Sequence, residues 1–173
     1  MTNTNSSQTS QAKEPRDLRL RNQHFPDAVQ VIFDKGKKGF VPLPVLMRKA
    51  MRYLSPVELR VLVYLQTRCS QYMICYPTID EIAHDLDLAG PRNLNPHIKS
   101  LERNKFISTV TAAGKKFFLV HDPAVAIAYL LDQGKVSSKD LFEINELLHA
   151  FNRDPIVPKP PGKVTPITQA KQA

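Results

Sequence analysis

Apolar residues recur at helical spacing in several stretches of this chain. In the segment YPTIDEIAHDLDL (76–88) they fall at positions i, i+3, i+4 and i+7, which form one face of a helix: Ile79, Ile82, Ala83 and Leu86. Thr78 precedes the stripe as a helix N-cap, and Glu81 completes a capping box. We therefore predict a helix that begins directly after Thr78.

The segment SPVELRVLVYLQTRC (55–69) has an equally complete helix start. Ser55 is the expected N-cap, Pro56 stands at the first helical position, and Glu58 closes a capping box. The apolar residues that follow wrap most of the way around the helix. This pattern is typical of a buried central helix.

The segment 90–107, GPRNLNPHIKSLERNKFI, has apolar spacing but contains two prolines. A helix beginning at Pro91 would place Pro96 in its interior, at a cost of about 3 kcal/mol. If Asn93 is the N-cap, Pro96 falls at the third helical position, where the N–H group has no partner in the helix. We therefore predict a helix over 94–104, with 89–92 as the preceding turn.

Alternating apolar residues predict β-structure in two places. Residues 28–44 read as a short hairpin with its turn at 34–39, and a short helix follows over 43–53. Residues 107–120 read as two strands around a turn at 112–116. Two further helices are expected after Asp122 and after Ser137.

The ends of the chain lack this patterning. Residues 1–27 are polar and we expect a disordered tail, and residues 153–173 are rich in proline and we expect an extended tail. The interior then divides into a domain over 28–121 and a helical extension over 122–152. We expect an α+β fold, mainly helical.

The net charge of the chain indicates the kind of partner it binds. The chain has 24 Lys and Arg against 16 Asp and Glu, a net charge of +8, and this balance favours an anionic partner such as nucleic acid. The basic residues are clustered: residues 77–88 carry four acids and no Lys or Arg, whereas residues 89–105 carry four bases and one acid.

A helix, a short turn, a second helix and a β-ribbon occur in the order of a winged helix–turn–helix. The segments YPTIDEIAHDLDL, NLNPHIKSLERNKFI and AAGKKFF, within about 54–120, resemble the winged-helix modules of bacterial and phage transcription regulators and of replication-initiation proteins. The resemblance implies a winged helix–turn–helix whose second helix enters the DNA major groove. This chain has Pro96 where those families usually carry a polar contact residue.

The predicted helix 94–104 supplies the candidate DNA contacts. The residues expected to meet base edges lie at its start and along its outer face: Arg92, Asn93, Asn95 and Lys99. Ser100 and Arg103 lie further along and are expected to meet phosphate groups. At the tip of the ribbon, or wing, Lys115 and Lys116 are expected to reach phosphate or the minor groove.

The sequence contains no motif for metal binding, catalysis or nucleotide binding. The cysteines in CSQYMIC (69–75) do not have a zinc-site spacing, the histidines are scattered, and the loop DKGKKG (34–39) lacks the ending of a nucleotide-binding loop. We therefore expect no enzyme, no metal and no cofactor. No signal sequence or membrane-spanning run is visible, so we expect a cytoplasmic, nucleoid-associated protein with reduced thiols.

Three interpretations remain open from the sequence. The chain is a sequence-specific regulator of transcription that binds double-stranded DNA, or a replication initiator at a plasmid or phage origin, or a protein–protein module without DNA. The tails are candidate contacts for replication or transcription proteins. The stripe Leu141, Ile144, Leu148 and Phe151 within 138–151 predicts either a homodimer interface or packing against the chain's own domain.

Overall fold

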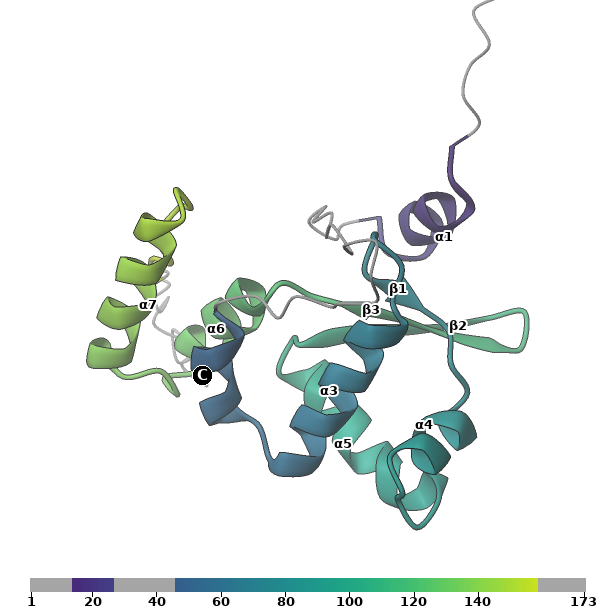
Figure 1. Ribbon diagram of the computed structural model, residues 1–173. Coiled ribbons are helices and arrows are strands. Elements are labelled where there is room, and N and C mark those ends of the chain that lie inside the picture. The colour runs from purple at the N-terminus through teal and green to yellow at the C-terminus, as the bar shows by residue number, and fades with distance from the viewer. Residues whose placement is uncertain (1–13, 27–45, 159–173) are drawn as a thin grey trace, which may run out of the picture.

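The structure of the chain is a computed structural model, and it describes residues 14–26 and 46–158. The fold is α+β and mainly helical, with a small antiparallel sheet, as expected from the sequence (Figure 1). The helices are α1 (Arg16–His24), α2 (Met47–Ala50), the 3₁₀ helix η1 (Met51–Tyr53), α3 (Pro56–Arg68), α4 (Ile79–Asp85), α5 (Pro91–Arg103), α6 (Pro123–Asp132) and α7 (Ser138–Ala150). The strands are β1 (Ile74–Cys75), β2 (Ile107–Ala112) and β3 (Lys115–Val120).

The helix starts predicted from capping residues are confirmed for α3 and α4. Ser55 accepts a hydrogen bond from the Glu58 N–H group, and the Glu58 carboxylate accepts one from the Ser55 N–H group. Thr78 and Glu81 form the same reciprocal pair at α4. Because each box satisfies two N–H groups that the helix cannot, these starts are set by local sequence.

The sheet has the strand order β1-β3-β2, with both pairings antiparallel. The hairpin of β2 and β3 agrees with the predicted ribbon, with Ile107 opposite Val120 and Ala112 opposite Lys115. Strand β1 was not predicted from the sequence. It pairs Ile74 with Leu119, so the chain between α3 and α4 adds the third strand.

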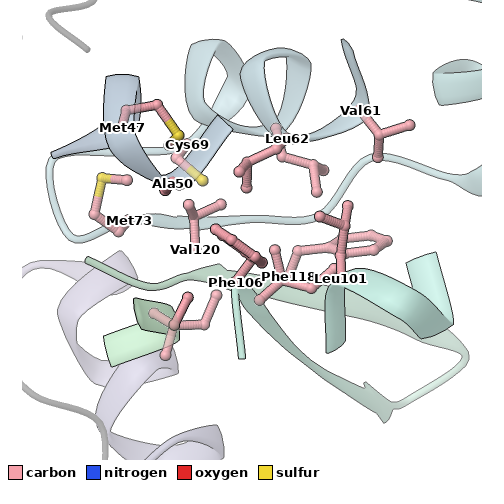
Figure 2. Packing of buried hydrophobic residues seen from close by; sticks show 14 of the residues in the cluster. Met47, Ala50, Val61, Leu62, Cys69, Met73, Leu101, Phe106, Phe118 and Val120 are labelled. Atoms are coloured by element: carbon pink, nitrogen blue, oxygen red, sulfur yellow. The ribbon is translucent and has the colours of Figure 1, made fainter. Parts of the chain in front are cut away.

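Both faces of β3 are covered, because its last four residues are all buried. One face packs against α3 and α5, where Phe118 is enclosed (Figure 2). In Figure 2, Phe106 and Leu101 lie beside Phe118 and below Leu62 of α3. Burying an aromatic side chain of this kind typically contributes several kcal/mol, so this cluster holds α5 against the sheet.

The opposite face of the sheet is covered by α1, so residues 16–24 of the predicted disordered tail are helical instead. The His24 ring stacks on Phe117 with centroids 4.8 Å apart, and Phe25 is buried in the core cluster. Arg21 is also buried. The sequence of α1 has a low apolar content, and its order depends on a sheet face that local patterning did not reveal.

His121 lies at the end of β3 on the same side of the sheet. Its Nε2 atom lies 2.8 Å from the Ser108 hydroxyl oxygen. Burial lowers the pKa of His121 below its usual value of 6.5, and the positive charges of Lys105 and Arg21 lower it further. His121 is therefore favoured in its neutral form in the folded chain.

The C-terminal helices form part of the same hydrophobic cluster as the sheet. Ile144 and Leu148 of α7 are buried within the chain, and Lys49 and Arg52 form ion pairs with Glu143 and Asp140. In Figure 1, α7 lies beside α6 and α2. The stripe proposed for a homodimer is therefore largely used in packing against the chain itself, and Phe151 at its end is 57% exposed.

The start of the predicted C-terminal tail is held against α7. The Asn145 side chain accepts a hydrogen bond from the Ile156 N–H group at 2.9 Å and donates one to the Ile156 carbonyl at 3.1 Å. The predicted hairpin over 28–44, residues 1–13 of the N-terminal tail and residues 159–173 of the C-terminal tail lie outside the described residues. In the part of the chain described, no helix is long and apolar enough to span a membrane.

Candidate nucleic-acid interface

Helix α5 begins at Pro91, three residues before the predicted start at Leu94. Gly90 is the N-cap, with φ +108°, and Pro91 occupies the first helical position. Asn93 lies inside the helix, as its third residue. The predicted N-cap was therefore wrong, and Pro96 is an interior residue of the helix.

The physical reason lies in the Gly-Pro pair. Only glycine readily adopts the positive φ of Gly90, and proline is already restricted to the φ of a first helical residue. The missing N–H of Pro96 leaves the Arg92 carbonyl without its helical donor. Arg92 is exposed, so water can hydrogen-bond to that carbonyl, while Leu94, Ile98 and Leu101 on the other side are buried to 0–1% exposure.

The earlier start brings the exposed basic residues of α5 into one line. At roughly 100° per residue, Arg92, Lys99 and Arg103 fall within about 40° of one another, opposite the buried stripe. Pro96 lies between them on the same face. We call the set Arg92, Lys99 and Arg103 the basic stripe; at about 1.5 Å per residue it runs about 16 Å along the helix.

The remaining candidates on α5 fall on its flanks. Asn95 and Asn93 are exposed on opposite sides of the basic stripe. Ser100 is half-buried, and its side chain is near enough to the Glu58 carboxylate of α3 to affect the pKa of that group. Burial would raise the pKa of Glu58, but the hydrogen bonds from Ser100 and Ser55 lower it below its usual value. The Ser100 side chain is thus close to α3 as well as half-exposed, and its contact with phosphate stays a prediction.

Glu102 fixes α5 relative to the wing. Its Oε1 atom accepts hydrogen bonds from the Thr109 N–H group at 3.2 Å and from the Thr109 hydroxyl at 2.8 Å. Thr109 lies in β2, so the Glu102 carboxylate joins α5 to the ribbon of β2 and β3. Sequence reasoning missed Glu102, because nothing in the local pattern distinguishes it from a solvated helix carboxylate.

The wing ends in a tight turn at Ala113 and Gly114, which have φ of +48° and +71°. Two residues with positive φ form the type of turn that matches the twist of a β-hairpin. Lys115 is exposed at this tip, whereas Lys116 is half-buried and its Nζ lies 5.7 Å from the centre of the Phe118 ring. Lys115 is therefore freer to reach a phosphate group than Lys116.

Two of the acidic side chains of α4 have polar partners. The Tyr64 hydroxyl of α3 donates a hydrogen bond to the Asp85 carboxylate at 2.9 Å, and Glu81 is used in the capping box. Burial and the contact with Asp85 raise the pKa of Tyr64 to about 12. The hydrogen bonds from Tyr64 and His84 lower the pKa of Asp85, which keeps it charged.

Metal-binding groups and similarity to known proteins also bear on the function of the chain. Within residues 14–26 and 46–158, no group of three or more His, Cys, Asp and Glu side chains is arranged to hold a metal ion. Comparison of the chain with protein-family models, with curated proteins and with solved structures finds no match.

Proposed function

We propose that this chain is a winged helix–turn–helix protein that binds double-stranded DNA sequence-specifically and regulates transcription. The observation that carries the proposal is the basic stripe, exposed on α5 opposite three fully buried apolar residues. The order α3, β1, α4, α5, β2, β3 supports it, since this order places a helix pair beside a ribbon.

In the proposed complex, α5 lies in the major groove, which is about 12 Å wide and admits a helix. Arg92, near the helix start, reads a base edge, because an arginine can pair bidentately with guanine. Asn95 is the second base-reading candidate, since an asparagine amide can pair with adenine. Pro96 offers an apolar surface to a thymine methyl group, in place of the polar contact expected there.

The backbone contacts come from residues farther from the helix start. Lys99 and Arg103 neutralise phosphate groups along one groove wall, and Lys115 at the wing tip reaches the adjacent backbone. Glu102 sets the angle between these two contact regions through Thr109. Three neutralised phosphates would make the logarithm of the affinity fall with the logarithm of salt at a slope of about −2.7.

The test selects the preferred duplex from a random pool and then measures its binding by fluorescence anisotropy at several salt concentrations. Arg92→Ala should lower affinity for the selected duplex by about 5- to 150-fold and reduce its preference over scrambled DNA. Lys115→Ala should weaken all duplexes alike. Lys139→Ala removes an exposed lysine of α7 and is the matched control, with no change expected.

Absence of duplex binding at about 50 mM salt would refute the proposal, and so would equal behaviour of the Arg92 and Lys139 variants. A replication initiator would use the same module on DNA. Mapping the bound sites along a genome separates the two roles, since a regulator should occupy promoters and an initiator an origin.

A further inference from the structure

The two cysteines of the chain meet in the core, although five residues separate them in the sequence. Cys69 ends α3 as its C-cap residue, and Cys75 lies in β1. Their sulfur atoms are 3.2 Å apart. The Cys69 thiol points toward the Cys75 sulfur, and the Cys75 thiol lies 3.7 Å from the Leu65 carbonyl oxygen.

The backbone between the cysteines holds them in this position. The Ser70 N–H group donates a hydrogen bond to the Ile74 carbonyl at 2.9 Å, and the Met73 N–H group donates one to the Ser70 carbonyl. The two cysteines flank this closed turn directly. Cys75 is further fixed by the pairing of β1 with Phe118 of β3.

We propose that Cys69 and Cys75 are a redox modification site that forms an intramolecular disulfide. A disulfide has a sulfur–sulfur bond of about 2.05 Å, so the sulfurs need to approach by only about 1.2 Å. Small rotations of the two side chains supply that movement. Loss of the thiol hydrogens leaves no acceptor unpaired, because the Leu65 carbonyl also accepts from the Cys69 N–H group at 2.9 Å.

A small oxidant of the peroxide class suits this site. Cys69 and Cys75 are only 1% and 3% exposed, but both line a solvent-open cleft of about 590 Å³ together with Thr67, Ser70 and Tyr76. Hydrogen peroxide is small enough to approach through that cleft, whereas a bulky disulfide reagent is excluded from buried sulfur.

The reaction balances with one peroxide per pair. One thiolate attacks a peroxide oxygen, an S–O bond forms as the O–O bond breaks, and the product is a sulfenic acid and one water. The second sulfur then attacks the sulfenic sulfur. The S–S bond forms as the S–O bond breaks, and a second water leaves, so that both thiol protons end in water.

The disulfide should stabilise the fold, because it joins the end of α3 to the sheet without moving either. Closing a loop of this length lowers the unfolding equilibrium constant by about 50-fold in the chain-entropy description. For a chain of this size, the midpoint of thermal unfolding should rise by about 5–9 °C. This inference does not depend on DNA binding, and its test does not use DNA.

The experiment treats the folded full-length chain with hydrogen peroxide, quenches it, and unfolds it in denaturant with a maleimide label. We expect a monomer whose mass is lower by two hydrogens and that takes up no label. After reduction, the same chain should take up two labels. Two labels on the peroxide-treated chain, or a disulfide found only between chains, would overturn the proposal. An oxidised chain with an unchanged or lower thermal midpoint would overturn the stated stabilisation.

The variants Cys69→Ala and Cys75→Ala serve as matched controls. Each keeps one thiol, so peroxide should give no intramolecular disulfide and no rise in the thermal midpoint. A rise of the same size in either variant would show that the effect comes from other oxidised residues, such as methionine, and would refute the assignment. Should a variant fail to fold, the labelling result on the unaltered chain still decides.

Discussion

Replacing Pro96 with alanine tests at which residue helix α5 begins. In the structure Pro96 is the sixth residue of α5 and is exposed, so the substitution changes no buried surface. It restores one N–H group, which can donate to the Arg92 carbonyl, and it removes the clash of the proline ring with that carbonyl. Both effects stabilise the folded chain.

The expected size follows from the position. An interior proline costs about 3 kcal/mol relative to alanine. Pro96 is close to the helix start, where the preceding turn can tilt, so we expect Pro96→Ala to raise the unfolding free energy by about 2 kcal/mol. If α5 instead began at Leu94, Pro96 would interrupt no hydrogen bond. Alanine would then lower stability by about 0.4–1 kcal/mol, because the unfolded chain gains freedom.

Urea titration monitored by circular dichroism measures this difference, and the two helix starts predict opposite signs. Asn93→Ala is the companion variant: as an N-cap, Asn93 would contribute about 1 kcal/mol, whereas inside the helix its loss should change stability by less than about 0.5 kcal/mol. A destabilised Pro96 variant together with a destabilised Asn93 variant would refute the start at Pro91.

Three further predictions test the packing around the site. Glu102→Ala should lower the unfolding free energy by about 1–3 kcal/mol, because the Thr109 N–H group loses its acceptor, whereas Glu102→Gln keeps an acceptor and should cost less in urea titration. Because the pKa of His121 is lowered on folding, the unfolded chain binds a proton first; the unfolding free energy should fall as the pH drops below about 6.5, and an asparagine at this position should flatten that pH profile. Ile144→Ala should cost about 2–5 kcal/mol, whereas Phe151→Ala should change stability by less than about 0.5 kcal/mol; sedimentation showing a dimer broken by the exposed Phe151 change would contradict packing within one chain.

The basic residues of the site could be named from the sequence, but not all of their roles could. Arg92, Lys99 and Arg103 were identified by type and position, and the structure brings them to one helix face. Ser100 was assigned to phosphate because it lies opposite the core on an isolated helix. A helical wheel carries no information on neighbouring helices, so the contact with Glu58 of α3 could not be predicted.

The same limit explains the elements that were missed. Strand β1 is two residues long, too short for an alternating pattern, and it exists because β3 offers an unpaired edge. Helix α1 is polar along most of its length and is ordered through Phe25 and the His24–Phe117 stack. Both elements depend on partners that are far away in the sequence.

The features with local causes could be predicted from the sequence alone. The capping boxes at Ser55 and Thr78 and the buried stripe of α5 follow from residues within one or two helical turns. Other features depend on contacts between distant parts of the chain, which can outweigh an unfavourable local conformation. The fold tolerates an interior Pro96, because Gly90 and Pro91 define an earlier helix start and Leu94 and Ile98 are buried in the core. It also brings together Cys69 and Cys75, whose spacing in the sequence is not that of a zinc site.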